Sequence, residues 1–263
     1  MNERRIIQTG IDVSRYQGKI DWARVKAGGT GFAIIKCTQG VNTVDPEFHR
    51  NMRNCAAVGL PVGAYVYSRA RTAFAAAEEA ERAAEECAPY HLDYPIAMDF
   101  EAAQFLAMPK KTRGAIIDAF CTRIKARGYK PMLYSSKYWL SALIPSETTR
   151  RWDVWLAQYA SRPTYSGDFT MWQRGTGKVD GIAGRVDIDI CYRDYVDESP
   201  DRIVFALTSP MMQGKPVSAL PAMLKAAGYT ASDGQRLNVD GKLGKRSFSA
   251  FVEFLNAHKK YIE

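Results

Sequence analysis

Two acidic residues, Asp99 and Glu101, stand one position apart at the end of the apolar segment "YPIAMDFEAAQ". In an extended strand, residues i and i+2 point to the same face with Cα atoms roughly 6.5 to 7 Å apart, so both carboxyl groups are expected on one side. Two like charges this close disfavour the doubly ionised state, and one proton is therefore held more tightly than in water. This arrangement suits acid catalysis. The alternative is a strand that simply ends in a solvated acidic loop.

The elements that must position these acids are predicted from the pattern of apolar residues. Segments with the length and composition of strands alternate, in the first half of the chain, with amphipathic segments. The expected strands are residues 5–14, 31–39, 61–69, 94–101, 130–136, 153–159, 169–175 and 184–192. The expected helices are residues 45–59, 72–90 and 110–128. Such alternation favours an α/β fold with a parallel sheet closed into a barrel. The later connections are short, so the last strands are expected to lack full helices.

The ends of the expected strands carry acids and aromatic residues. They are Asp12, Tyr65, Tyr67, Asp99, Glu101, Tyr134, Tyr159, Trp172, Asp187 and Asp189. Barrel enzymes place their chemistry at the carboxyl ends of the strands, so we expect these side chains to converge at one mouth. Each residue also has a structural reading: a tyrosine can be a core residue with its hydroxyl at the rim, and Asp12 can cap a loop.

Carboxyl groups surrounded by aromatic rings favour a carbohydrate substrate. Sugar rings stack on aromatic faces, and cleavage of a glycosidic bond needs a carboxylic acid and a second group that stabilises the developing positive charge. A sugar-binding mouth without catalysis remains an alternative. The sequence contains no phosphate-binding or dinucleotide-binding glycine motif and no motif for Ser-His-Asp or Cys-His chemistry. We expect no cofactor and no protein-bound metal.

Composition and charge narrow the partners. The chain has 263 residues, a net charge of +8 and a pI near 9.2, which favour an anionic partner such as a bacterial wall polymer. The excess of basic residues can also serve solubility alone. No nucleic-acid-binding motif is present, so we expect no nucleic acid partner, and we expect no membrane insertion. The beginning of the sequence lacks the apolar run of a Sec signal peptide, which predicts synthesis in the cytoplasm without such a leader.

Several motifs in the expected order resemble the glycoside hydrolase family 25 lysozymes, the Chalaropsis-type muramidases. The motifs are "GIDVSRYQGKIDW", "VDPEFHRNMRNCAAVGLPVGAYVYSR", "IAMDFE", "DVWLAQY" and "MWQRGTGKVDGIAGRVDIDICY". The resemblance spans residues 8 to about 195. It implies an irregular TIM-like barrel of five β/α units and three further strands. It also implies hydrolysis of the β-1,4 bond between N-acetylmuramic acid and N-acetylglucosamine in peptidoglycan, without a cofactor.

The resemblance also implies roles for individual residues. It places the catalytic acid at Glu101 with Asp99 as its partner, and it adds Asp12 and Asp187 to the catalytic group. The remaining residues at the mouth are expected to bind substrate: Tyr65, Tyr67, Tyr134, Tyr159, Trp172, Gln173 and Asp189. Whether Asp99 attacks the sugar itself or orients the 2-acetamido group of the substrate stays open, although we favour substrate assistance. Asp12 and Asp187 are then expected to position Asp99 or the proton of Glu101.

The sequence departs from the family pattern at three positions. Gln39 stands where similar proteins usually have an acid, Val66 where a histidine is usual, and Asp189 where asparagine is common. The added carboxylate of Asp189 is expected to raise neighbouring pKa values. None of the departures removes an expected catalytic residue, so we expect activity.

Beyond residue 196 the composition changes, and we expect a linker at 197–212 and a small helical module at 213–263. The module resembles three-helix peptidoglycan-binding modules, with Pro221 in place of a usual glutamine. Alternatives are a helical cap on the barrel or a self-association element, giving a monomer or a weak oligomer. We expect action on the cell wall after holin-dependent release or non-Sec export, as an endolysin or an autolysin. Rival functions are a chitinase-type glycosidase and a non-catalytic wall-binding protein.

Overall fold

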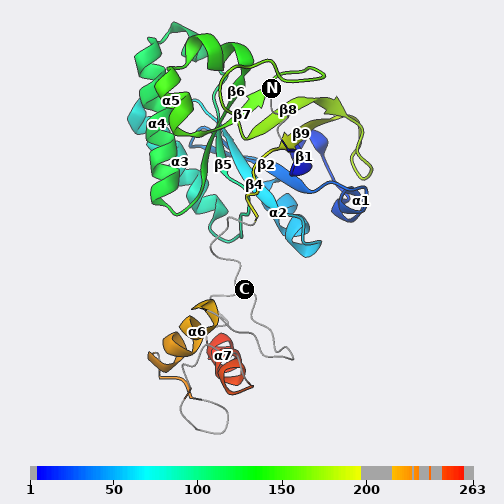
Figure 1. Cartoon of the computed structure of the whole chain (residues 1–263), viewed down its shortest axis with the longest axis vertical. Coiled ribbons are helices and arrows are strands. Elements are labelled where there is room, and N and C mark those ends of the chain that lie inside the picture. Colours follow the sequence, from blue (N-terminus) through cyan, green and yellow to red (C-terminus); the bar gives the residue numbers. More distant parts are fainter. Residues whose placement is uncertain (1–4, 197–214, 227, 231–236, 238–244, 258–263) are drawn as a thin grey trace. The chain divides into compact units, whose positions relative to one another are not determined.

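The computed structural model describes residues 5–196, 215–226, 228–230, 237 and 245–257 (Figure 1). The chain divides into two compact units, Met1–Glu198 and Ser199–Glu263. The first unit contains all of the predicted strands and is the one that positions the candidate site. The linker expected at 197–212 lies outside the described residues.

Within residues 5–196, eight strands close into a barrel, because β1 pairs with β2 on one side and with β9 on the other. The barrel strands are β1 (Gln8–Val13), β2 (Phe32–Gln39), β4 (Val62–Tyr67), β5 (Ile96–Asp99), β6 (Pro131–Ser136), β7 (Asp153–Ala157), β8 (Met171–Gly177) and β9 (Val186–Cys191). The short β3 (Thr43–Val44) pairs only with β2. The predicted α/β barrel is confirmed.

One strand runs against the others. The barrel strands β1, β2, β4, β5, β6, β7 and β8 are parallel to their neighbours in that order, whereas β9 is antiparallel to both β8 and β1. A hairpin connection from β8 reverses the chain, so the beginning of β9 lies at the end of the barrel where the other strands finish. Asp187 therefore reaches the mouth while Asp189 lies one layer deeper. The expectation that both residues share the mouth is wrong for Asp189, because it assumed that all strands run the same way.

Five helices connect the first strands: α1 (Trp22–Ala27), α2 (Phe48–Ala57), α3 (Ala73–Cys87), α4 (Lys110–Ala126) and α5 (Ser146–Arg151). The predicted helices are confirmed as α2, α3 and α4, and Figure 1 shows α3, α4 and α5 together on one flank of the barrel. The sequence reading missed α1 and α5, whose six residues each are too few to show a clear helical period. As expected, no helix intervenes between β7, β8 and β9 in this part of the chain.

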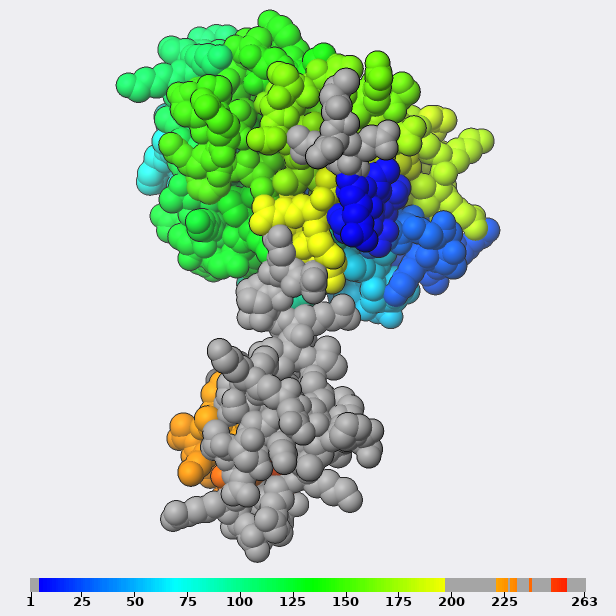
Figure 2. All heavy atoms as spheres, in the orientation of Figure 1, coloured from blue at the N-terminus to red at the C-terminus, as the bar shows by residue number. Residues whose placement is uncertain are grey.

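Two apolar layers hold the barrel together. The inner layer fills the barrel and comprises Phe32, Ile34, Tyr94, Ala97, Met132, Trp155, Met171, Cys191 and Tyr195. The outer, larger layer packs the opposite strand faces against the helices, as strand alternation requires. Figure 2 shows the first residues of β1 beside the segment near residue 190, in agreement with the hydrogen bond from the Ile7 amide to the Cys191 carbonyl, 2.9 Å.

The second unit is described mainly at two helices, α6 (Lys215–Ala226) and α7 (Lys245–Ala257). Leu224, Leu237 and Ala250 are buried together, and the rings of Tyr229 and Phe254 meet edge to face at 5.5 Å. The two helices thus share a small apolar core of their own. Among the described residues of the whole chain, no helix combines the length and apolar character needed to cross a lipid bilayer.

Candidate active site

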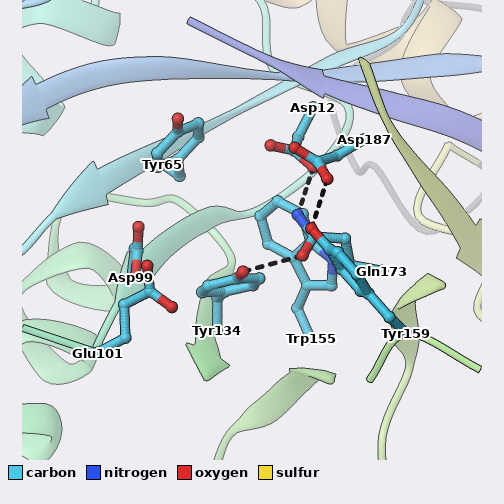
Figure 3. A pocket seen from close by; sticks show the side chains of 9 residues that line it. All are labelled: Asp12, Tyr65, Asp99, Glu101, Tyr134, Trp155, Tyr159, Gln173 and Asp187. Carbon is cyan, nitrogen blue, oxygen red and sulfur yellow. Dashed lines mark hydrogen bonds between the residues drawn. The ribbon is translucent and has the colours of Figure 1, made fainter. Parts of the chain in front are cut away.

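A pocket of about 290 Å³ opens at the end of the barrel where the parallel strands finish (Figure 3). Its lining consists of Asp12, Tyr65, Asp99, Glu101, Tyr134, Trp155, Tyr159, Gln173 and Asp187. All four residues expected to be catalytic therefore lie in one cavity. They come from β1, from the end of β5 and from the beginning of β9, which lie far apart in sequence.

One wall of the pocket is formed by Asp99 and Glu101, whose side chains lie next to each other in Figure 3. Asp99 is 6% exposed and one of its carboxyl oxygens, Oδ1, is buried without a hydrogen-bond partner among the described residues. Burial, and then the charge of Glu101, raise the pKa of Asp99 well above its ordinary value. Glu101 reaches solvent at the mouth, and desolvation followed by the charge of Asp187 raises its pKa as well. Both carboxyl groups of this wall therefore bind a proton more tightly than they would in water.

The opposite wall is formed by Asp12 and Asp187, which are paired in register between β1 and β9. Here each carboxylate accepts a hydrogen bond. Gln173 Nε2 donates to Asp12 Oδ2 at 2.7 Å, and the Tyr159 hydroxyl donates to Asp187 Oδ1 at 2.7 Å. Burial, and then the charge of Asp187, raise the pKa of Asp12 to about 7. These carboxylates are held in place by their donors.

The floor of the pocket is aromatic, with Trp155 at its centre. Its ring is met edge-on by Tyr134 at 4.6 Å and by Tyr65 at 6.4 Å between ring centroids. The Tyr134 hydroxyl donates to Gln173 Oε1 at 2.9 Å, which links the floor to the wall that contains Asp12. The sequence reading did not select Trp155. The signal was available, because Trp155 lies two and four positions before Ala157 and Tyr159, on the same face of an alternating strand.

Three residues expected to bind substrate do not line the pocket. Trp172 is 3% exposed and its indole N–H donates to the Gln158 carbonyl at 2.8 Å within the outer apolar layer, because it alternates with the inward-facing Gln173. Asp189 is fully buried below the pocket and accepts a hydrogen bond from Trp155 Nε1 at 2.8 Å. Tyr67 lies beside the pocket, in register with Asp99 on the neighbouring strand.

The three departures from the family pattern also have definite places. Val66 is fully buried in the outer layer, so it faces away from the pocket. Gln39 ends β2 and accepts a hydrogen bond from Lys36 Nζ at 3.1 Å. Asp189 interacts directly with Asp12, and burial followed by the charge of Asp12 raises the pKa of Asp189 well above its ordinary value.

The arrangement can carry out proton transfer beside a flat apolar ligand surface. An exposed acid with a raised pKa can protonate a leaving group, and the aromatic floor can support a ring with an apolar face. Within the described residues, no three His, Cys, Asp or Glu side chains are placed to hold a metal ion. The carboxyl groups that line the pocket are able to act as acids and bases.

Comparison with known proteins gives concordant results. Residues 11–182 match the sequence profile "Glycosyl hydrolases family 25". Lysozyme M1 of Streptomyces globisporus is 32% identical over 193 residues, covering 68% of this chain and 65% of that protein. The crystal structure of a bacterial lysozyme from Streptomyces coelicolor superimposes with a TM-score of 0.59 and 28% identity, covering 69% of this chain and 90% of that one.

A third relative carries additional regions. The modular autolysin LytC of Streptococcus pneumoniae, solved in complex with a synthetic peptidoglycan ligand, matches with a TM-score of 0.61 and 26% identity. That match covers 70% of this chain and 46% of the autolysin. The similarity is therefore that of the barrel. The matched profile ends before β9, so Asp187 joins the site on the geometry described above.

Proposed function

Because this chain belongs to glycosyl hydrolase family 25, we propose that it is a muramidase that cleaves the β-1,4 bond between N-acetylmuramic acid and N-acetylglucosamine in peptidoglycan. The observation that carries the proposal is the acid wall of Asp99 and Glu101 above an aromatic floor in a single pocket. Lysozymes and an autolysin among the similar proteins support the same substrate.

Glu101 acts first as general acid in this proposal. It reaches solvent at the mouth, where the glycosidic oxygen of a bound glycan would arrive, and desolvation followed by the charge of Asp187 raises its pKa above the ordinary value, as suits a general acid. After the bond breaks, the ionised Glu101 accepts a proton from water that attacks the sugar. The same residue thus serves both half-reactions.

Asp99 supports the positive charge that develops on the sugar. We favour a mechanism in which the 2-acetamido oxygen of the substrate is the nucleophile and Asp99 orients that group, because Asp99 is buried and less accessible than Glu101. Direct attack by Asp99 is the alternative within the same pocket. The i, i+2 spacing is compatible with both mechanisms.

Asp12 and Asp187 act as positioning residues. Their hydrogen bonds to Gln173 and Tyr159 fix them opposite the acid wall. From that position the charge of Asp187 adds to the effect of desolvation in raising the pKa of Glu101. Asp187 therefore favours retention of the proton on Glu101, and Asp12 fixes the wall beside it.

The setting of the reaction is also part of the proposal. The enzyme acts on the cell wall after release from the cytoplasm, either through a holin or by a non-Sec route. The second unit binds the wall and raises the effective concentration of the barrel at its substrate. Self-association through that unit is the alternative, and sedimentation of the full chain with and without wall fragments distinguishes the two.

The test is clearing of purified Gram-positive cell walls by wild type, Glu101→Gln and the control Glu85→Gln, which alters an exposed carboxylate on α3. We expect Glu101→Gln to lose clearing by about a thousandfold, within the range for removal of a general acid. The control should clear normally, and N-acetylmuramic acid should appear at the new reducing ends.

Three results would contradict the proposal. Full clearing by Glu101→Gln would remove that residue as the acid. Comparable cleavage of chitin oligomers would indicate a chitinase-type glycosidase. Wall binding without release of reducing ends by wild type would indicate a non-catalytic binding protein.

A further inference from the structure

A pair of cations flanks one aromatic ring at the edge of the acidic pocket. Lys36 Nζ lies 5.2 Å from the centroid of the Tyr67 ring, and the guanidinium carbon of Arg69 lies 5.0 Å from the same centroid. Both distances are within the range of cation–π attraction. We call Lys36, Tyr67 and Arg69 the cationic edge. It is distinct from the pocket lining, which contains no lysine or arginine.

The register of the sheet places this edge directly beside the acid wall. Gln39 pairs with Tyr67, and Tyr67 pairs with Asp99, on three successive parallel strands. Neighbouring strands are about 4.8 Å apart, and paired residues in parallel strands point to the same face. A ligand that contacts Asp99 is therefore within reach of the cationic edge.

The backbone that carries Arg69 is fixed by buried groups. The amide of Arg69 donates to Glu79 Oε1 at 2.7 Å, and the hydroxyl of Ser68 donates to Glu79 Oε2 at 2.6 Å. Glu79 is 2% exposed, so its carboxylate is shielded from solvent and accepts hydrogen bonds from this turn. Gln104 Nε2 donates to the Arg69 carbonyl at 2.7 Å. The position of Arg69 is thus set by the fold, while its guanidinium remains exposed.

Carboxylates of the protein attract the two cations from a distance, Asp45 and Asp99 acting on Lys36 and Glu79 on Arg69, but within the described part of the chain neither cation is in direct contact with one. The hydrogen-bond acceptor of Lys36 is the neutral amide oxygen of Gln39, 3.1 Å away. Among the residues that the structure describes, neither Lys36 nor Arg69 forms an ion pair with a carboxylate. A neutral glycan gains no charge partner from the half-buried Lys36 and the exposed Arg69, whereas an anionic group on the glycan gains a partner and is shielded from the nearby carboxylates.

We propose that the cationic edge is a subsite for a carboxylate of the peptide stem that peptidoglycan carries on its lactyl group. This inference rests on the proposed muramidase function and deepens it, because it explains how an acidic pocket accepts an anionic polymer. Arg69 provides a planar pair of donors that matches a carboxylate, and Lys36 adds a second charge over the same Tyr67 ring. The subsite would distinguish peptide-bearing wall glycan from chitin.

The test uses soluble uncrosslinked peptidoglycan strands in two forms, one with free stem carboxylates and one with those carboxylates converted to methylamides before the enzyme is added. Wild type should show kcat/KM about tenfold higher for the free carboxylates, as expected for a charge-assisted hydrogen bond. Arg69→Gln should remove this preference. Arg174→Gln is the matched control, because Arg174 is also an exposed arginine above an aromatic ring, 5.9 Å from the centroid of Trp172.

Binding provides a readout that does not need catalysis. The Kd of both strand forms is measured by calorimetry for Glu101→Gln and for the double variant Glu101→Gln/Arg69→Gln. A preference for free carboxylates that is lost in the double variant supports the subsite. Equal Kd values for both forms with Glu101→Gln, or a preference that survives removal of Arg69, overturn it.

The two proposals fail in different ways. If wild type cleaves both strand forms equally well, the muramidase stands and the cationic edge is not a carboxylate subsite. If wild type cleaves neither form, the muramidase proposal fails, and the Kd comparison alone then decides whether the cationic edge binds carboxylates.

Discussion

Both walls of the pocket contain a pair of carboxyl groups, but the two pairs differ in whether the protein donates hydrogen bonds to them. On the β5 wall, Asp99 and Glu101 have no hydrogen-bond donor among the described residues. On the β1 and β9 wall, Asp12 and Asp187 each accept a hydrogen bond of 2.7 Å. An unpartnered carboxyl group can exchange its proton with a ligand, whereas a partnered one is fixed in direction and charge. The contrast separates the groups that react from those that position.

The largest expected effect comes from replacing the carboxyl group of the buried Asp99 with an amide. Asp99→Asn should lower kcat by about a thousandfold, near the effect of losing a positioned acid or base, while the KM for soluble strands changes little. Asp187→Asn on the opposite wall should cost less, since Asp187 does not contact the reacting atoms. Steady-state kinetics of both variants measures the contrast. Equal losses would mean that the two walls have equivalent roles.

Removing the bridge that restrains Asp12 tests the positioning wall. Gln173→Met keeps a similar side-chain length but leaves Asp12 Oδ2 and the Tyr134 hydroxyl without their partner. A displacement of the restrained wall should lower kcat by about tenfold, because small misplacements around a reaction centre are costly. The measurement is kcat beside the thermal midpoint. A loss of stability with unchanged kcat would show that the bridge is structural only.

The hydroxyl at the exposed side of the positioning wall should matter less. Tyr159→Phe keeps the ring and removes the donor to Asp187 Oδ1. Because Tyr159 is 64% exposed, water can replace the hydroxyl, and we expect a loss in kcat/KM of about threefold, the order of a net neutral hydrogen bond. Tyr159→Ala should lose more if the ring also contacts sugar. Identical values for both variants would assign no contact to the ring.

The smallest expected change concerns stability and its pH dependence. Asp189 is buried with a raised pKa, so the folded state binds its proton more tightly than the unfolded state, and its contribution to stability is lost as pH rises toward the folded pKa. Asp189→Asn can still accept from Trp155 and can donate to Asp12. We expect the thermal midpoint to rise by about 2–4 °C at pH 8, which corresponds to about 1 kcal/mol for a unit of this size.

The pH comparison makes the stability prediction specific. Near pH 4 wild-type Asp189 is already protonated in the folded state, so the gain of the variant should shrink. A gain that is the same at pH 4 and pH 8 would contradict the assignment of a proton to Asp189.

The order of strands and helices in the barrel was predictable from the sequence, because the length of a strand, the period of a helix and the residues at a strand end are all visible in short stretches of chain. Those signals predict that Asp12, Asp99, Glu101 and Asp187 lie at one mouth, and all four line one pocket. They could not reveal the direction of β9, which depends on a hairpin and on pairing with β1. Asp189 was therefore placed one layer too high.

The alternation of side chains along a strand distinguishes residues that face the pocket from residues that face the helices. Trp172 and Gln173 are adjacent, so only one can face the pocket, and the floor residue Trp155 shares its face with Tyr159. The alternation of side chains along a strand predicts that Gln173 and Trp172 face opposite sides, and that Trp155 and Tyr159 face the same side. The hydrogen bonds of Gln173 to Asp12 and Tyr134 join residues more than a hundred and about forty positions apart in the chain, respectively, and no local pattern announces them.

The pairing of β1 with β9 has a consequence for biosynthesis. Asp12 leaves the ribosome long before β9, but its wall is complete only when Val186–Cys191 has been made and has closed the barrel. Contacts between such distant segments form late, because the entropy of closing the long intervening chain must be overcome first. Nascent or truncated chains that end before β9 should therefore lack the positioning wall and stay inactive. We therefore expect catalytic activity only after β9, the last strand of the barrel, has been synthesised and has paired with β1.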